Sequence, residues 1–271
     1  MIIDGKAIAL QIEAEIKDKI CKIKPYLAAV TVGTNDATQS YIRNIQKIGS
    51  ELGVAVEIAN LQSNSSTQEV IDLTLHLNSK ADGIIIGRPL PSHIDEQAVI
   101  AAILPEKDID CLHPINLGRL ILGTPLFTPC TPQAVMEILT RSNTKISGKR
   151  VTIVGRSNIV GKPLAIMLIQ KGVDATVTIC HTKTKELLLH TKSADILIAA
   201  VGFPGLIRAS MVKPGAVVID VGINVVEGKL VGDVEFKEVE KMASLITPVP
   251  GGVGPITTRL LFRNVLLAKS K

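Results

Sequence analysis

The chain has 271 residues, nearly half of them hydrophobic, and a formal net charge of +5. This length allows two domains, each with its own buried core. Only two Tyr, four Phe and no Trp are present, so few rings could stack on bases, and the basic residues are interspersed with acidic ones. Both features argue against nucleic-acid binding. Cores built from Ile, Val, Leu and Ala are instead typical of parallel α/β sheets.

The cysteines are widely scattered and include no C-x-x-C pair: Cys21, Cys111, Cys130 and Cys180. We expect small buried thiols in a reducing cytoplasm and no zinc site. The first residues lack the long apolar segment of a signal peptide, and no run approaches the ~20 apolar residues that cross a bilayer. The sequence therefore predicts a cytoplasmic protein with no membrane partner and no metal.

The first half of the chain alternates strand-like runs with amphipathic segments. Strands are expected over 26–33, 54–59 and 81–87, with helices around 36–52 and 67–79 between them. Runs of this kind, separated by helical patterns, indicate βαβ units and a parallel sheet.

A domain boundary is expected near the middle of the chain. A helix beginning near Pro132 leads into the polar, Gly-containing segment 143–149, and such segments are typical of boundaries. We expect residues 1–142 plus 250–271 to form one α/β domain. Residues 143–249 would form a second domain.

The second half contains another strand series, with one helix over 161–172 and a terminal helix over 255–269. The expected strands cover 151–155, 175–180, 194–202, 215–222 and 245–249. Right-handed crossovers would make this series a Rossmann-type parallel sheet.

The most informative segment runs from Arg150 to Pro163. A strand-like run ends at Gly155 and a helix is predicted to begin near Gly161. Glycine lets the backbone turn tightly beside a pyrophosphate, whose charge is favoured by N–H groups at the helix start. A P-loop fits less well, because Pro163 stands where Ser or Thr would hold magnesium. A tight turn without a ligand stays the alternative.

The end of the next strand bears on cofactor choice. NAD-preferring sites place a carboxylate there, but this chain has Thr182 and Lys183, with Arg156 in the glycine turn. A hydroxyl and two cations favour a 2′-phosphate, so NADP is the predicted cofactor. His181 could act as a general base, yet without a visible partner a packed or capping role is favoured.

Several stretches resemble, in order and across the whole chain, the methylenetetrahydrofolate dehydrogenase/cyclohydrolase family. They are residues 3–6, 32–33 with Tyr41, 89–91, 107–110 with His113 and Asn116, 129–132, 155–157 with 160–161, 220–224 and 247–255. The resemblance implies an α/β substrate domain, a Rossmann NADP domain, a cleft at their junction and a homodimer. It also implies hydride transfer from methylenetetrahydrofolate to NADP in one-carbon metabolism.

The resemblance also implies roles for individual residues. Tyr41 would stack on the folate, and Asp110 would accept hydrogen bonds from the pterin ring, which offers paired N–H donors along one edge. The family places the loop of Pro250 and Gly251 at the cleft. The implied cofactor contacts are Gly155, Arg156, Ser157, Val160, Gly161, Thr182, Lys183 and Ile223.

Two residues depart together from the family pattern. Ile45 stands where the family has a lysine that serves the cyclohydrolase step, and Gly87 stands where it has the partner glutamine. Lys47 lies on another helix face and cannot substitute. Hydride transfer needs mainly proximity and orientation, whereas hydrolysis needs proton movements. We therefore expect a dehydrogenase whose cyclohydrolase activity is weak or absent.

Arg88 is new relative to the family's leucine. It could stabilise charge near the folate, bind the glutamate tail of the substrate, or form a surface or interdomain ion pair. Its guanidinium is always protonated and is a poor general base.

Two other functions stay open. A different Rossmann dehydrogenase would need a base or an arginine clamp for a small acid. A non-catalytic folate- or nucleotide-binding protein is favoured only by the missing lysine.

Overall fold

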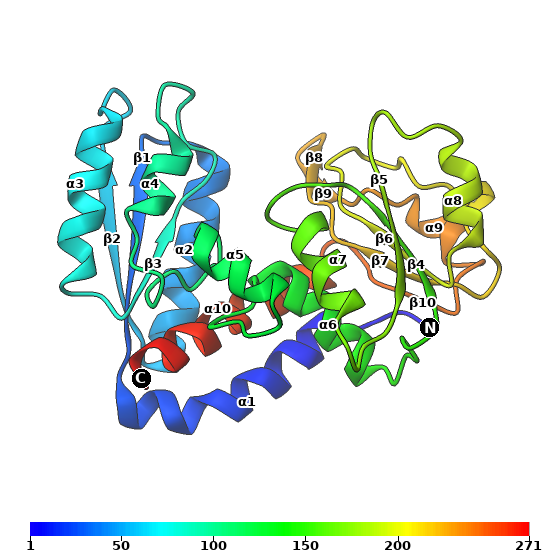
Figure 1. The fold of residues 1–271 in the computed structure, drawn as a ribbon, viewed down its shortest axis with the longest axis horizontal. Coiled ribbons are helices and arrows are strands. Elements are labelled where there is room, and N and C mark those ends of the chain that lie inside the picture. Colours follow the sequence, from blue (N-terminus) through cyan, green and yellow to red (C-terminus); the bar gives the residue numbers. More distant parts are fainter. Residues whose placement is uncertain (271) are drawn as a thin grey trace. The chain divides into compact units, whose positions relative to one another are not determined.

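The computed structural model describes residues 1–270, which form two compact α/β units (Figure 1). The three-stranded unit, named for its sheet, contains Ile12–Thr128 and the segment from Thr258 onward. The five-stranded unit contains Met1–Gln11 and Pro129–Thr257. The predicted α/β class and parallel sheets are confirmed.

The division between the units differs from the expected boundaries of 1–142 plus 250–271 and 143–249. The start of the chain belongs to the five-stranded unit because Ile3 N donates to Ile246 O at 2.9 Å and Gly5 N donates to Gly251 O at 3.0 Å. Helix α6 (Cys130–Arg141) packs on a helix of the same unit. Helices α1 (Gly5–Ile23) and α10 (Val253–Lys269) contribute residues to both units.

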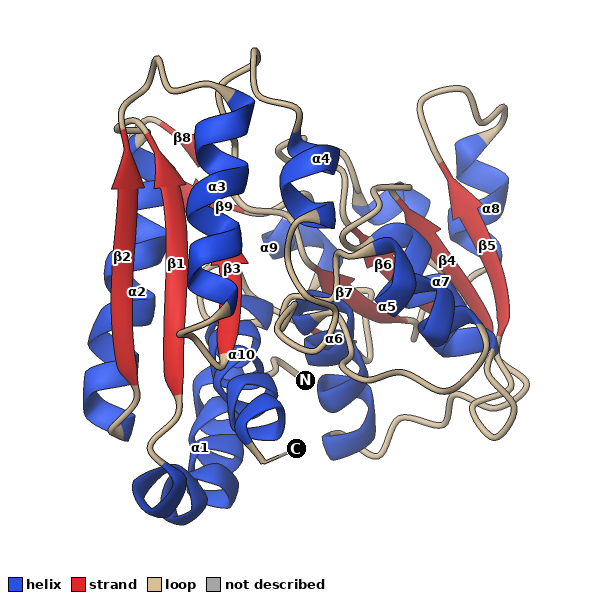
Figure 2. Ribbon diagram, turned by 60° about the vertical axis from the view of Figure 1, so that its left-hand side comes forward, coloured by secondary structure: helices blue, strands red, loops and turns tan. Residues whose placement is uncertain are grey.

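The three-stranded sheet has the order β2-β1-β3, and both pairings are parallel. Figure 2 shows these strands side by side. Their bounds are β1 Tyr26–Val32, β2 Ala55–Leu61 and β3 Gly83–Ile86, and the helices of this unit are α2 Asp36–Leu52, α3 Thr67–Asn78, α4 Glu96–Ala101 and α5 Pro114–Ile121. The strand and helix predictions for this half are confirmed.

Local sequence signals define the two longest helices of this unit. Asn35 caps α2 by accepting a hydrogen bond from Thr38 N at 3.1 Å, and the helix ends at Gly53, whose φ is +82°. Ser66 and Glu69 form a reciprocal capping box at the start of α3. Such caps satisfy backbone groups that have no partner inside the helix.

The five-stranded sheet has the order β10-β7-β6-β4-β5, and all of its pairings are parallel. Its strands are β4 Arg150–Val154, β5 Thr176–Cys180, β6 Ile196–Ala199, β7 Val217–Asp220 and β10 Leu245–Ile246, and its further elements are α7 Gly161–Ile169, α8 Leu187–Ser193, the 3₁₀ turn Ala209–Met211 and α9 Phe236–Val239. The first strand, β4, lies between β5 and β6. This is the point where the strand order reverses in a doubly wound sheet, and ligands bind beyond the carboxyl ends of the strands there.

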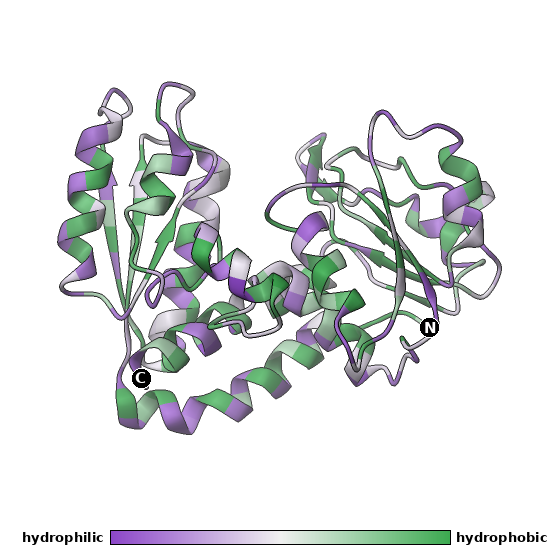
Figure 3. Cartoon of the chain, in the orientation of Figure 1, coloured by the Kyte–Doolittle hydropathy of each residue, from purple (hydrophilic) through white to green (hydrophobic). Residues whose placement is uncertain are grey.

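The central strands are strongly hydrophobic, as Figure 3 shows. All four residues of β3 and of β6 are buried, which is expected for parallel strands covered on both faces. The strands predicted over 194–202 and 215–222 are shorter in the structure, since their ends continue as loops. The sequence analysis did not predict α1 or the antiparallel hairpin of β8 (Asn224–Val226) and β9 (Lys229–Val231).

The four cysteines are free thiols. Cys111, Cys130 and Cys180 are buried, but the expectation of a buried thiol was wrong for Cys21, which lies in α1 and is exposed. Within residues 1–270, no helix is both long and apolar enough to cross a membrane.

Candidate functional site

The turn between β4 and α7 has a shape that only glycine permits. Gly155 has a φ of +128°, and a Cβ at this position would lie 2.1 Å from the carbonyl oxygen of Ala200. A Cβ at Gly161 would lie 2.1 Å from Gly155 O. Helix α7 begins at Gly161, as predicted. The close backbone approach suits a phosphate group, although the N–H groups of Gly161 and Lys162 already donate to Ser157 within the turn.

Ser157 orders this turn. Its Oγ accepts hydrogen bonds from Val160 N at 3.0 Å and from Gly161 N at 3.4 Å. The side chain therefore stabilises the shape that the phosphate would meet. Val160 stands at the position just before the helix and is half-buried.

The polar residues predicted to select the cofactor follow neighbouring strands. Gly155 N donates to Cys180 O at 2.9 Å, which places the glycine turn beside the end of β5. Arg156 follows β4, Thr182 and Lys183 follow β5, and all three are exposed. The structure thus brings a hydroxyl and two cationic residues to the carboxyl ends of adjacent strands. Ile223, which is 64% exposed, comes after β7.

His181 has the capping role that the sequence favoured. Its Nδ1 accepts a hydrogen bond from Lys183 N at 3.1 Å, and its own backbone N–H donates to Thr184 Oγ1 at 2.8 Å. The ring therefore organises the turn after β5.

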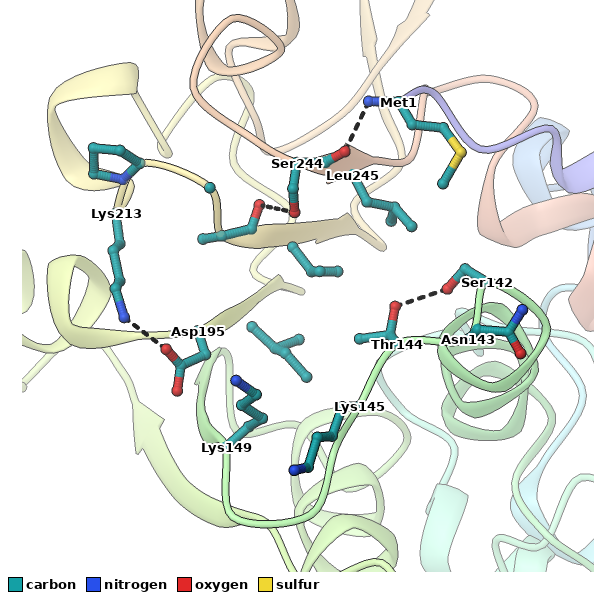
Figure 4. Close-up of a pocket in the computed structure, with 15 residues that line it drawn as sticks. Met1, Ser142, Asn143, Thr144, Lys145, Lys149, Asp195, Lys213, Ser244 and Leu245 are labelled. Carbon is teal, nitrogen blue, oxygen red and sulfur yellow. Dashed lines mark hydrogen bonds and ion pairs between the residues drawn. The ribbon is translucent and has the colours of Figure 1, made fainter.

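The five-stranded sheet has a cavity of about 510 Å³ at its amino edge, opposite the glycine turn, as Figure 4 shows. Its lining includes Lys145, Lys149 and the ion pair of Lys213 with Asp195 at 2.6 Å. It lies at the amino ends of the strands, whereas dinucleotides bind outside the carboxyl ends. None of the predicted site residues lines it.

In the three-stranded unit, α2 presents Tyr41 and Ile45 in successive turns of one face. Tyr41 is 39% exposed, but Ile45 is completely buried. Position 45 therefore belongs to the core of this unit. Its side chain can neither reach solvent nor exchange a proton.

The surroundings of Gly87 are already filled. A Cβ at Gly87 would lie 2.8 Å from Thr38 Cγ2 and 2.9 Å from Thr31 Cγ2. Thr38 is held there because its Oγ1 donates to Arg88 O at 2.9 Å, while Gly87 N donates to Val30 O at 2.7 Å. A longer side chain at position 87 would displace these threonine methyl groups.

Arg88 links two acidic side chains of the same unit. Its guanidinium nitrogens lie 3.6 Å from Asp110 Oδ2 and 3.5 Å from Glu96 Oε1. The Arg88 and Asp110 side chains are each about one-fifth exposed. The structure therefore brings Arg88 to Asp110 and shows an ion pair inside one unit, whereas the sequence considered a surface or interdomain pair.

A buried carboxylate shapes the loop that carries Asp110. Asp108 accepts hydrogen bonds from Leu112 N at 3.1 Å, His113 N at 2.8 Å and Asn116 Nδ2 at 2.8 Å. Burial is the main cause that raises the pKa of Asp108 to about 6. A parallel bridge between Ile84 and Asp108 places this loop beside β3.

Pro250 and Gly251 lie in the other unit, in the loop between β10 and α10. Gly251 has a φ of +103°, and its carbonyl accepts the hydrogen bond from Gly5. Their contact with a folate stays a prediction.

Sequence reasoning missed Thr38 and Glu96. Its spacing could have indicated Thr38, because it lies one helical turn before Tyr41 and therefore on the same helix face. No sequence pattern indicated Glu96.

Among residues 1–270, no group of three or more His, Cys, Asp or Glu side chains could hold a metal ion.

Comparisons with known proteins agree with this arrangement. Residues 3–110 match the family model "Tetrahydrofolate dehydrogenase/cyclohydrolase, catalytic domain", and residues 129–271 match the corresponding NAD(P)-binding domain. The bifunctional protein FolD of Exiguobacterium sibiricum is 46% identical over 99% of both chains. That of Lactococcus lactis subsp. lactis is 48% identical over 100% of this chain and 97% of its own.

Solved structures show the same fold. The FolD enzyme of Campylobacter jejuni has a TM-score of 0.96 and 42% identity, covering 100% of this chain and 98% of its own. The FolD of Trypanosoma brucei, complexed with NADP cofactor and inhibitor, has a TM-score of 0.95 and 37% identity, covering 100% of this chain and 97% of its own. With both domains matched over nearly the whole length, this chain belongs to the tetrahydrofolate dehydrogenase/cyclohydrolase family.

Proposed function

We propose that this chain is an NADP-dependent methylenetetrahydrofolate dehydrogenase with weak or absent cyclohydrolase activity. It would oxidise 5,10-methylenetetrahydrofolate to 5,10-methenyltetrahydrofolate in one-carbon metabolism. The observation that carries the proposal is a contrast between two sites: the glycine turn of the cofactor site is intact, whereas the corner that would support hydrolysis is filled by Ile45 and two threonine methyl groups.

The cofactor proposal rests on the carboxyl edge of the five-stranded sheet. Gly155 and Gly161 allow the tight backbone turn that suits a phosphate, because a Cβ at either position would collide with a backbone oxygen. Arg156, Thr182 and Lys183 provide two cations and a hydroxyl for a 2′-phosphate, and the family relative from T. brucei is complexed with NADP. When bound, NADP accepts the hydride.

Tyr41 and Asp110 are the proposed substrate contacts. The partly exposed ring of Tyr41 can stack on a pterin. The Asp110 carboxylate can accept from the pterin N–H groups while Arg88 fixes one side of it. Loss of hydride leaves a cation that the flanking folate nitrogens stabilise. This step needs orientation rather than a proton-transferring side chain.

Hydrolysis of the methenyl product makes different demands. Water attack requires proton movements, and loss of a group that performs them typically costs about 10²–10⁴-fold in rate. A buried isoleucine offers no such group. Arg88 is engaged by two carboxylates and stays protonated, so it is a poor substitute.

The family resemblance also leads us to propose a homodimer in the cytoplasm. Sedimentation equilibrium of the purified chain would give twice its 28.9 kDa monomer mass. A monomer mass at micromolar concentration would contradict the dimer without affecting the proposed chemistry.

The direct test supplies methylenetetrahydrofolate and NADP and records NADPH and the methenyl product as separate signals. We expect NADPH to form and the methenyl product to accumulate. Tight binding of both ligands without NADPH formation would support the non-catalytic alternative. Turnover of small hydroxy or amino acids without folate oxidation would favour a different Rossmann dehydrogenase.

A further inference from the structure

The loop after β6 forms part of the crevice edge although the sequence analysis assigned it no role. It begins at Ala200, whose carbonyl oxygen contacts the backbone of Gly155 so closely that no Cβ fits between them. Strands β4 and β6 are adjacent, and the strand order reverses between them. A dinucleotide bound at this switch point therefore meets both the Gly155 turn and the loop after β6.

One buried carboxylate holds that loop. Asp233, which follows β9, is 0% exposed. It accepts hydrogen bonds from three consecutive backbone N–H groups of the loop: Val201 at 2.6 Å, Gly202 at 3.0 Å and Phe203 at 2.9 Å. Asn224 Nδ2 adds a fourth bond at 2.9 Å. The β8–β9 hairpin region thereby fixes a loop that lies about 30 residues earlier in the chain.

The same carboxylate contacts the loop after β7. A Cβ at Gly222 would lie 2.1 Å from Asp233 Oδ1, so only glycine lets the backbone pass this close. The next residue is Ile223, a predicted cofactor contact. Asp220 secures the other side, since it accepts from Asp233 N at 3.0 Å and Val234 N at 2.9 Å. Asp233 thus joins the loops that follow β6 and β7.

Asp233 shapes the loop after β6 and at the same time occupies its backbone N–H donors. Successive backbone N–H groups aimed at one point form a concavity that binds anions. Here Asp233 already fills the concavity, so a cofactor phosphate cannot use these donors and must use the Gly155 turn. What remains available to a ligand is the outer side of the loop, where Phe203 is 61% exposed.

We propose that Asp233 is a positioning residue for the cofactor, acting by holding the Val201–Phe203 loop as a wall of the NADP crevice. The inference rests on the proposed function because it assumes that NADP binds at this switch point. Asp233 itself would not touch the cofactor. It acts through the backbone that it holds.

Asp233→Asn tests the proposal with little change in shape. Whichever way the amide is turned, its NH₂ group faces backbone N–H donors that the carboxylate now satisfies. We expect the Kd for NADP, titrated well below the unfolding temperature, to rise by about tenfold, because charge-assisted bonds are lost. The Kd for methylenetetrahydrofolate, whose proposed contacts Tyr41 and Asp110 lie in the other unit, should stay within about twofold.

Asp195→Asn is the matched control. Asp195 also accepts a backbone N–H at a strand end, from Arg150 at 3.0 Å, but it lies at the amino edge of the same sheet. Its variant should bind NADP like the unmodified protein. If Asp195→Asn weakened NADP binding as much as Asp233→Asn, the effect would be general loosening of the unit and the proposal would fail.

A milder variant tests the same proposal if Asp233→Asn does not fold. Asn224→Ala removes the fourth hydrogen bond to Asp233, together with a longer one of 3.5 Å to Val231 O, and we expect about a threefold rise in the Kd for NADP. Equal NADP affinity in the unmodified chain and in the soluble variants would overturn the proposal. Absence of NADP binding by the unmodified chain would instead overturn the proposed function.

Discussion

Glycine permits close packing in both units, but with different consequences for the proposed chemistry. In the five-stranded unit, Gly155 and Gly161 let three backbone segments approach one another in the turn that we propose as the cradle of a cofactor phosphate. In the three-stranded unit, Gly87 lets the methyl groups of Thr31 and Thr38 close over the end of β3. The first use of glycine shapes a proposed site. The second closes one.

A missing side chain therefore does not imply a vacant space. Gly87 looks in the sequence like a simple deletion of a polar group, yet the neighbouring threonines occupy the volume. Ile45 completes the change because it is sealed in the core of the unit. The altered corner is therefore packed, and introducing a single polar residue there will not restore its chemistry.

Ile45→Lys should have the largest effect, on the stability of the three-stranded unit. A lysine at this fully buried position has no described partner to offset the loss of water around its charge, so we expect a loss of about 4 kcal/mol in the free energy of unfolding. Urea denaturation measures this loss. Gln46→Lys, at the exposed neighbouring position, is the control and should change stability by less than about 0.5 kcal/mol. Equal stability of the two variants would show that position 45 is not sealed.

Gly155→Ala should come next, with a loss of at least about 100-fold in NADP affinity, because the new Cβ would collide with Ala200 O in a backbone conformation that alanine avoids. Isothermal titration with NADP measures the effect. Gly148→Ala is a matched control, since Gly148 also has a positive φ, +76°, but its Cβ would meet no atom within 4 Å. Similar NADP affinities for both variants would rule out the cradle.

The raised pKa of Asp108 leads us to expect a pH dependence of intermediate size in the free energy of unfolding. Its pKa is raised from 3.8 to about 6 in the folded chain, mainly by burial, so the folded state binds this proton more readily than the unfolded state. The contribution of Asp108 to stability is therefore present at low pH and falls by about 2 kcal/mol as pH rises from about 4 to about 6.

Unfolding curves of the unmodified chain and of Asp108→Asn, recorded across this pH range, test that sign. The free energy of unfolding of the unmodified chain minus that of Asp108→Asn should fall as pH rises. If this free-energy difference instead rose with pH, the hydrogen bonds to the carboxylate would outweigh the cost of burying its charge.

Arg88→Leu should have the smallest effect. It removes an ion pair with Asp110 but no proton-transferring group, so we expect the KM for methylenetetrahydrofolate to rise by about threefold. Hydrolysis of the methenyl product should stay at its uncatalysed rate. Glu96→Gln, which leaves the Arg88–Asp110 pair in place, should change the KM less. A fall in enzyme-dependent hydrolysis in Arg88→Leu would assign Arg88 the catalytic role that we deny it.

Local patterns were sufficient for the elements that carry the predicted site. The apolar run before Gly155 and the helix after Gly161 marked the β4–α7 turn, and helical periodicity placed Tyr41 and Ile45 on one face of α2. These signals are short-range, because turn glycines and helix caps act within a few residues.

Long-range contacts account for what the sequence did not reveal. The first residues belong to the five-stranded unit because Ile3 bonds Ile246, a pairing that no local pattern marks. The contact of Asp233 with Val201 likewise joins residues far apart in the chain. The closure around Gly87 depends on two threonines from different elements, which only the folded arrangement brings together.

The most direct test of the central claim isolates the hydrolysis half-reaction. The purified chain is given methenyltetrahydrofolate without NADP, beside a no-enzyme control and the 48% identical L. lactis relative as a reference. Methenyl decay with this chain should equal the no-enzyme rate, although the same preparation reduces NADP with methylenetetrahydrofolate. Decay well above the no-enzyme rate would overturn the proposed loss of cyclohydrolase activity, because a group other than the residue at position 45 would then be performing the hydrolysis.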